Sequence, residues 1–325
     1  MEATAPERIR IDSYVAESGP DTLAEDVREG LTRMPKELPP KYFYDARGSE
    51  LFDRITTLPE YYPPRCERAI LNRYAPQFVG GMQELVELGS GTASKTRALL
   101  YAMAGSGTLR RYVPFDVDQS VVARCAQELT ELYPGLAVHG VVGDFERDLE
   151  RIPAGERRLF ALLGGTIGNL YPQERAAFLA RVRALMGSRD RLLIGTDLVK
   201  ERAALEAAYD DSEGVTAEFN RNVLRVLNAS LGADFDPARF EHVAVYDEER
   251  AWIEMRLRSR EAQTVTVADL GLEVEFAEGE EMLTEISSKF TPERVEHELR
   301  EAGLVLEDFV CDPEGLFGVS LGVVR

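Results

Sequence analysis

Between residues 84 and 197, short apolar runs alternate with longer segments whose apolar residues recur at helical spacing. We expect strands at 85–88, 111–115, 136–142, 159–163 and 191–196. We expect helices at 94–104, 119–133 and 173–186. This alternation predicts an α/β fold with a parallel sheet covered by helices on both faces. Such sheets bind ligands at the carboxyl ends of their strands.

After residue 197 the pattern changes. Segments 201–209 and 216–228 have helical spacing, whereas 251–258, 264–267 and 272–276 alternate with a period of two. A helix at 292–302 and strands at 304–310 and 317–324 then close the chain and would complete the first sheet. The sequence therefore predicts an antiparallel α+β insertion over roughly 200–290. Near the start, a helix is expected at 22–32, and residues 1–20 are expected to be an extended lead-in.

The first expected strand ends in a turn with two glycines, Gly89 and Gly91. Glycine suits a sharp reversal in which a ligand approaches bare backbone. The pattern is Glu-x-Gly-x-Gly and lacks the third glycine of the dinucleotide motif, which favours S-adenosylmethionine over NAD. A purely structural turn between strand and helix is the alternative.

Polar residues also follow the later strands of this sheet. Asp116 could accept hydrogen bonds from ribose hydroxyls, Asp144 could take an adenine amino hydrogen, and Phe145 could pack on the base. Gly164 and Asn169 lie in the loop after the next strand. Each acidic residue could instead be a helix N-cap, but that alternative is less credible for all of them together.

Composition narrows the function classes. The chain has 325 residues, 44% of them hydrophobic, and a net charge of −19, which disfavours nucleic acid and anionic membranes as partners. No apolar run approaches the roughly 20 residues of a membrane helix, and Met1 begins no leader-like segment, so a cytoplasmic location is expected. The three cysteines and three histidines lack zinc-site spacing, so no metal is expected. The histidines are expected at the surface or at strand edges.

Aromatic residues cluster between positions 42 and 63 and include Tyr44, Phe52 and Tyr61. They could be an anchoring cluster against the core. Aromatic residues beside turns are also a common way to wall a small-molecule pocket.

Several longer motifs carry a resemblance to a known family. They are 42–49 (YFYDARGS), 58–63 (LPEYYP), 88–92 (LGSGT), 164–169 (GGTIGN), 209–211 (YDD), 218–222 (EFNRN) and 281–287 (EMLTEIS). With these motifs the chain resembles the S-adenosylmethionine-dependent amino-acid Nα-methyltransferases typified by the ergothioneine-pathway histidine methyltransferase. Only the N-terminal lead-in and residues 229–250 lack such a motif.

The resemblance implies a class I, Rossmann-like methyltransferase with a seven-stranded sheet and an inserted α+β substrate-binding domain. Residues 66–200 and 290–325 would bind S-adenosylmethionine. Residues 11–65 and 201–289 would form the domain that binds the amino acid.

Residue roles also follow from the resemblance. Tyr61, Asn169 and Tyr209 would hold the substrate carboxylate and amine, and Lys95 would contact the cofactor carboxylate. Tyr44, Phe52 and Met255 would line the reaction chamber.

Glu285 and Ser287 would bind an imidazole. Strand alternation puts these two residues on one face, roughly 7 Å apart, which suits the two ring nitrogens. A solvated strand face is the alternative for this pair.

The expected reaction is trimethylation of the α-amino group of L-histidine to give hercynine, with Tyr44 or a water taking the proton. Alternatives are the same chemistry on tryptophan or tyrosine, or a silent amino-acid- or nucleoside-binding module. A monomer is expected.

Overall fold

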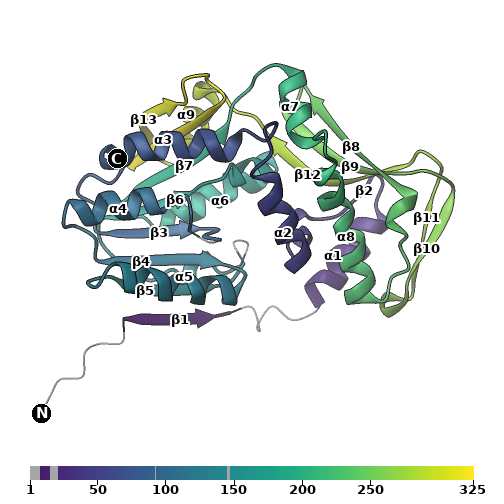
Figure 1. Cartoon of the computed structure of the whole chain (residues 1–325), viewed down its shortest axis with the longest axis horizontal. Helices are drawn as coiled ribbons and strands as arrows, with labels where there is room; N and C mark the ends of the chain where they lie inside the picture. The colour runs from purple at the N-terminus through teal and green to yellow at the C-terminus, as the bar shows by residue number, and fades with distance from the viewer. Residues whose placement is uncertain (1–7, 15–20, 92, 145–146) are drawn as a thin grey trace, which may run out of the picture. The chain divides into compact units, whose positions relative to one another are not determined.

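The computed structural model describes residues 8–14, 21–91, 93–144 and 147–325 (Figure 1). The chain divides into two compact units. The first unit contains residues 65–198 and 290–325 together with the N-terminal strand, and the second contains residues 19–64 and 199–289.

The first unit is built on an eight-stranded sheet. From edge to edge its strands are β1 (Ile9–Ser13), β5 (Ala137–Val142), β4 (Arg111–Asp116), β3 (Glu84–Leu88), β6 (Arg158–Leu162), β7 (Arg191–Asp197), β14 (Phe317–Val324) and β13 (Leu304–Cys311). The pairs from β1 to β7 are parallel, whereas β14 runs antiparallel to both β7 and β13. The expected seven strands are therefore present, and β1 adds an eighth.

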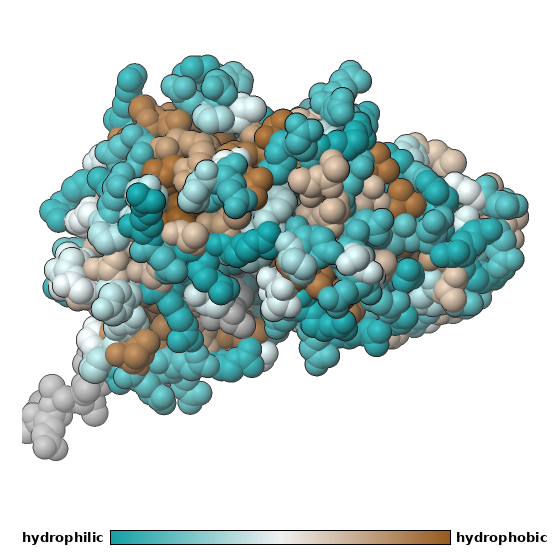
Figure 2. All heavy atoms as spheres, turned by 45° about the horizontal axis from the view of Figure 1, so that its top comes forward, coloured by the Kyte–Doolittle hydropathy of each residue, from teal (hydrophilic) through white to brown (hydrophobic). Residues whose placement is uncertain are grey.

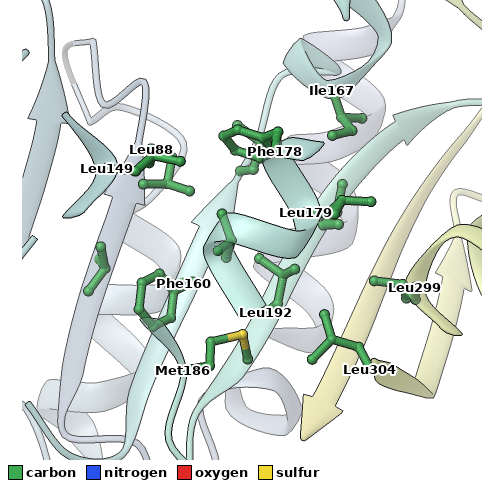
Figure 3. Packing of buried hydrophobic residues seen from close by; sticks show 14 of the residues in the cluster. Leu88, Leu149, Phe160, Ile167, Phe178, Leu179, Met186, Leu192, Leu299 and Leu304 are labelled. Atoms are coloured by element: carbon green, nitrogen blue, oxygen red, sulfur yellow. The ribbon is translucent and has the colours of Figure 1, made fainter. Parts of the chain in front are cut away.

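Buried apolar strands and amphipathic helices explain this unit. The helices are α3 (Pro63–Phe78), α4 (Arg97–Gly105), α5 (Gln119–Leu132), α6 (Pro172–Leu185) and α9 (Pro292–Glu301). Figure 3 shows Phe178 and Leu179 of α6 in the same buried cluster as Phe160 of β6 and Leu192 of β7. Phe160 is fully buried, so truncating it to alanine would cost about 3–5 kcal/mol. This core fixes the strand ends that carry the candidate site.

Strand β1 corrects two expectations. Residues 1–20 were expected as a lead-in and residues 11–65 as part of the substrate-binding domain, yet Ile9–Ser13 pairs in parallel with β5 of the first unit. The edge position explains the error, because β1 contributes only five residues and none of them is fully buried. A Cβ on Gly140 of β5 would lie 2.5 Å from the Val122 side chain of the covering helix and 3.3 Å from the Ile11 side chain of β1, so glycine leaves room for both.

The second unit has the expected α+β composition. Its four-stranded sheet has the order β2 (Lys36–Glu37), β12 (Glu281–Ser288), β9 (Trp252–Ser259) and β8 (Phe240–Asp247), and β10 (Gln263–Val267) pairs with β11 (Leu272–Phe276). Its helices are α1 (Asp21–Thr32), α2 (Ala46–Ile55), α7 (Arg202–Tyr209) and α8 (Val215–Leu231). Helix α8 packs on α2, β8 and β9.

Short 3-10 helices complete the two units. They are η2 (Pro40–Phe43), η3 (Leu149–Arg151), η4 (Thr166–Asn169), η5 (Pro237–Arg239) and η6 (Ala268–Leu270).

On the face shown in Figure 2, hydrophilic residues cover most of the surface and hydrophobic residues lie in separate patches. In the part of the chain that the structure describes, no helix is long and apolar enough to cross a membrane. Over the same ranges no cluster of three or more His, Cys, Asp or Glu side chains could hold a metal ion. Cys66, Cys125 and Cys311 are all free thiols.

Candidate functional site

The glycine turn follows β3 and is held by its neighbour β4. Backbone N–H groups of Gly89 and Ser90 donate to the Phe115 carbonyl at 2.9 and 3.1 Å. Gly89 and Gly91 have φ values of +74° and +47°, which L side chains rarely adopt. A Cβ on Gly91 would meet no atom within 4 Å, so open space lies over this backbone.

Asp116 ends β4 and ties the turn down. Its Oδ2 accepts the Gly91 N–H at 2.8 Å, and its Oδ1 accepts the Asp118 N–H at 3.1 Å. Burial raises the pKa of the Asp116 carboxyl, and the backbone N–H donors of Gly91 and Asp118 work in the opposite direction. An ionised carboxylate has about four acceptor positions, so Asp116 can still accept hydrogen bonds from a hydroxyl pair.

Lys95 and Gly164 share a partner that the sequence analysis missed. Lys95 Nζ lies 3.2 Å from Oε2 of Glu67, whose side chain is fully buried, and Glu67 Oε1 accepts the Gly164 N–H at 2.7 Å. Gly164 has a φ of +82°, and a Cβ there would lie 2.6 Å from Lys95 Nζ. The structure thus brings Lys95 and Gly164 together, and the Lys95 ammonium has further N–H donors for an anionic ligand.

Two other predicted residues lie at neighbouring strand ends. Asp144 follows β5, is half-buried, and its backbone N–H donates to Asp148 Oδ2 at 2.9 Å. Asn169 is the last residue of η4, and its side chain makes no hydrogen bond to any residue that the structure describes. Phe145 lies outside the described residues.

Glu87 of β3 supports the glycine turn from inside the sheet. Its buried carboxylate accepts hydrogen bonds from the hydroxyls of Thr96 and Tyr112. Burial raises the pKa of Glu87 to about 7, although both hydroxyls favour the ionised form. Residues 94–96, expected as the start of a helix, form a turn instead, and α4 begins at Arg97.

The second unit gathers the predicted aromatic residues. Ring centroids lie 5.6 Å apart for Tyr44 and Phe52, 6.4 Å for Phe52 and Tyr61, and 6.0 Å for Tyr61 and Tyr209. Phe219 of α8 was not predicted as part of the site, and it packs 5.5 Å from Tyr44 and 5.9 Å from Phe52. All three pairs between the predicted residues are edge-to-face, the geometry that ring quadrupoles favour.

Local motifs fix the backbone that carries Tyr44 and Phe52. Asp45 caps α2 by accepting the Gly48 N–H at 2.7 Å, and it also accepts from Asn222 Nδ2 at 2.7 Å. A Cβ on Gly48 would lie 1.7 Å from the Phe43 carbonyl oxygen, so only glycine fits there. The motifs at 42–49 and 218–222 therefore hold α2 against α8.

Two further contacts fix Tyr61 and Tyr209. Glu60 accepts a hydrogen bond from the Ser212 hydroxyl at 2.7 Å, which ties the Tyr61 segment to the turn after α7. Asp211 accepts the backbone N–H groups of Val215 and Thr216 at 2.9 and 2.7 Å and so pairs the first two N–H groups of α8.

Glu285 and Ser287 lie on β12 and are 9% and 5% exposed, so the alternative of a solvated strand face is wrong. Met255 of β9 is opposite Glu285 in the strand register and is also buried. The Glu285 carboxylate accepts no hydrogen bond from any described residue. Burial raises the pKa of Glu285 to about 7, and the Lys289 ammonium partly opposes this shift.

Tyr44 faces the same carboxylate. The pKa of its phenol is raised well above the usual value, first by loss of solvent and then by the charges of Glu285, Tyr61 and Tyr209. Tyr44 keeps 45% of its surface exposed, and the Glu285 carboxylate repels a phenolate at this position. Tyr44 is therefore a neutral phenol near neutral pH.

His242 was expected at a surface or a strand edge; it lies on the edge strand β8, but it is buried and not at the surface. The residue is 8% exposed in β8, accepts from Asn220 Nδ2 at Nδ1 over 2.8 Å, and donates from Nε2 to the Tyr209 carbonyl over 2.7 Å. Burial lowers the pKa of His242, so the ring is held neutral with its proton on Nε2. It supports the backbone of Tyr209.

Sheet order, the open glycine turn and the carboxylate at the end of β4 define a class I S-adenosylmethionine-dependent methyltransferase. The sequence profile described as "Histidine-specific methyltransferase, SAM-dependent" matches residues 23–324. The chain belongs to this family.

Curated relatives agree with this assignment. The chain is 54% identical to a histidine N-alpha-methyltransferase of Mycolicibacterium smegmatis, over 95% of this chain and 97% of that protein. It is 51% identical to a histidine N-alpha-methyltransferase of Mycobacterium tuberculosis, over 97% and 99% of the two chains. It is also 31% identical to ergothioneine biosynthesis protein 1 of Schizosaccharomyces pombe, over 74% of this chain and 33% of that protein.

Proposed function

We propose that this enzyme transfers three methyl groups from S-adenosylmethionine to the α-amino nitrogen of L-histidine, giving hercynine for ergothioneine biosynthesis. Two relatives carry the histidine N-alpha-methyltransferase name, and a third is named for ergothioneine biosynthesis. The observation that carries the substrate assignment is the Glu285 carboxylate, which is buried and lacks a hydrogen-bond donor among the described residues.

This carboxylate keeps only 9% of the residue's surface exposed and no described donor reaches it, so a ligand N–H group supplies a partner that the described residues do not. We propose that the imidazole N–H of histidine donates to Glu285 and that its other ring nitrogen meets Ser287. Such a contact to an ionised group is about twice as strong as a neutral hydrogen bond. A substrate without this donor leaves the charge unpaired, so the site also disfavours competitors. Met255 and Phe52 would pack on the ring.

The α-amine and carboxylate would be held by Tyr61, Asn169 and Tyr209. An Asn side chain offers a donor and an acceptor without adding charge to a site that must take a sulfonium. The Tyr209 hydroxyl donates to Ser287 and accepts from Lys289, which fixes the position of its oxygen beside Ser287. Tyrosine rings also favour the quaternary ammonium of the product.

The cofactor would be held by Gly89, Gly91, Lys95, Asp116, Asp144, Phe145 and Gly164. Three observations support this proposal for Gly91, Asp116 and Lys95: open space over Gly91, acceptor positions left on Asp116, and further N–H donors on the Lys95 ammonium. When bound, S-adenosylmethionine supplies an electrophilic methyl group on a sulfonium. The chain's own residues contribute mainly positioning, which can account for about 7–11 kcal/mol of a barrier.

Each transfer needs a neutral amine, and an α-amino group is mainly protonated near neutral pH. We propose that the Tyr44 hydroxyl passes this proton on, directly or through water. With its raised pKa, Tyr44 does this by accepting one hydrogen as it gives up another, without forming a phenolate.

The test compares kcat/KM for histidine and for tryptophan in the wild type and in Glu285→Ala. We expect the variant to lose about 2–4 kcal/mol of transition-state binding with histidine and much less with tryptophan. Shortening Met255 as well should shift preference further toward tryptophan. Glu278→Ala, an exposed residue just before β12, is the control and should leave the ratio unchanged. An unchanged ratio in Glu285→Ala would contradict imidazole recognition by this strand.

We further propose a cytoplasmic monomer. The net charge of −19 disfavours self-association of this chain. Light scattering after size exclusion should give the monomer mass of 36.3 kDa, and a dimer mass would contradict the proposal.

A further inference from the structure

Lys289 follows β12 directly and is fully buried. Its ammonium donates to the Ser287 hydroxyl oxygen at 2.9 Å and to the Tyr209 hydroxyl oxygen at 3.1 Å. The same Nζ lies 4.6 Å from the centroid of the Tyr209 ring. A lysine ammonium can only donate, so its contacts determine what the two hydroxyls have left to offer.

Ser287 accepts two hydrogen bonds. One comes from Lys289, and the other comes from the Tyr209 hydroxyl at 2.7 Å. A serine hydroxyl has two lone pairs and one hydrogen, so both lone pairs are occupied. The Ser287 hydroxyl can therefore offer a ligand only its hydrogen.

Glu285 lies two residues earlier on the same strand and, when ionised, only accepts. The pair thus presents one acceptor and one donor. A neutral imidazole has the matching set, with one N–H and one bare nitrogen. Carbon-only rings lack the bare nitrogen.

We propose that Lys289 is a positioning residue that holds Ser287 as a hydrogen-bond donor and so selects substrate rings with a bare nitrogen beside Ser287. This inference rests on the proposed histidine methylation. Without Lys289, Ser287 regains a lone pair and its hydroxyl can accept as well as donate. The donor also loses the polarisation that the adjacent cation supplies.

A purely structural role makes a different prediction. If Lys289 only balances the charge of Glu285 or fills space, its loss weakens the binding of all substrate analogues by the same factor. The discriminating quantity is therefore the ratio of affinities within a matched pair of ligands, because general damage to the site cancels in that ratio.

Two pairs of amino acids differ only by ring nitrogen against CH. They are thiazol-4-ylalanine with thiophen-3-ylalanine, and thiazol-5-ylalanine with thiophen-2-ylalanine. The two pairs place the nitrogen at each of the two imidazole positions in turn. Affinities are measured by calorimetric titration in the presence of S-adenosylhomocysteine, so turnover is not required.

In the wild type, one pair should favour the nitrogen ring by about fivefold to tenfold, the worth of one hydrogen bond. In Lys289→Met that preference should fall at least threefold while the thiophene affinity changes little. Lys289→Arg, which keeps a donor-only cation, should restore much of the preference. Lys36→Met is the matched control, since Lys36 is also a buried lysine of this sheet but pairs with Glu280, and it should leave the preference unchanged.

Tyr209→Phe removes the other hydrogen bond to Ser287 and keeps the test decisive if Lys289→Met does not fold. It should lower the same preference by a smaller factor. An unchanged preference in Lys289→Met, or in Tyr209→Phe where Lys289→Met does not fold, would overturn the inference.

Ser287→Ala separates this inference from the proposed function. If the wild type shows no preference in either pair, or Ser287→Ala keeps it, imidazole recognition by Ser287 itself fails. If Ser287→Ala abolishes the preference and Lys289→Met keeps it, only the role of Lys289 fails.

Discussion

Replacing Glu285 by glutamine should stabilise the fold at alkaline pH while weakening histidine binding. The carboxyl has a pKa of about 7 in the folded chain, against a reference of 4.5. Between these values the unfolded carboxyl has lost its proton and the folded one keeps it. Unfolding therefore releases a proton, and rising pH favours unfolding.

The size of the effect follows from the shift. At 1.36 kcal/mol per pKa unit, the full change is about 3 kcal/mol, and most of it falls between about pH 5 and about pH 8. Glutamine has the same shape and does not titrate. The unfolding free energy of Glu285→Gln minus that of the wild type should rise by this amount over that range.

Urea unfolding at several pH values measures this difference directly. Taking this difference cancels the contribution of other titrating groups to the pH dependence, such as that of Glu87 with its pKa of about 7. Glu281→Gln on the same strand is the control. The pKa of Glu281 is lowered by its hydrogen bonds to Arg256 and Arg258, against the effect of burial, so its stabilisation is lost only as pH falls below the unfolded value. Its difference should stay flat from about pH 5 to about pH 8. Parallel curves for Glu285→Gln and the wild type would refute the reasoning.

Three other substitutions test separate parts of the site. Gly91→Val should lower the affinity for S-adenosylhomocysteine at least about tenfold in a calorimetric titration, because φ is +47° and the new side chain fills the open space. The control Gly107→Val, at φ +69° with equally open space, should leave this affinity unchanged, and equal losses in both variants would contradict the cofactor assignment. Asn169→Ala should reduce kcat with histidine steeply while S-adenosylhomocysteine still binds, and near-normal turnover would make the loop after β6 structural only. His242→Phe should lower the unfolding free energy by about 1–3 kcal/mol in urea, because the Tyr209 carbonyl loses its buried partner; unchanged stability would mean that this hydrogen bond is dispensable.

The first unit could be predicted largely from the sequence. Strands such as β4 and β7 are almost entirely buried, so their continuous apolar runs predict them. Asp116 was found because it directly follows such a run. Edge strand β1 was missed because none of its five residues is fully buried, so its pattern is weak. Predicting it would require knowing that β5 needs a neighbour.

In the second unit, motif resemblance located Tyr44, Glu285 and Ser287, but the supporting polar residues stayed hidden. Lys289 and His242 are charged or titratable types that usually lie at the surface, and their burial depends on partners distant in sequence. The partners of Lys289 include Tyr209, which lies on a helix 80 residues earlier in the sequence. Such networks arise from packing, which spacing alone does not reveal.

The most direct test of the central claim is mass spectrometry of the products formed from a panel of amino acids and S-adenosylmethionine. We predict that histidine alone is converted efficiently, that its α-nitrogen ends with three methyl groups, and that three molecules of S-adenosylhomocysteine form for each hercynine. Methylation of tryptophan or tyrosine in preference to histidine would contradict the substrate assignment. Cofactor binding without any methylated product would contradict the claim that this protein is an active methyltransferase.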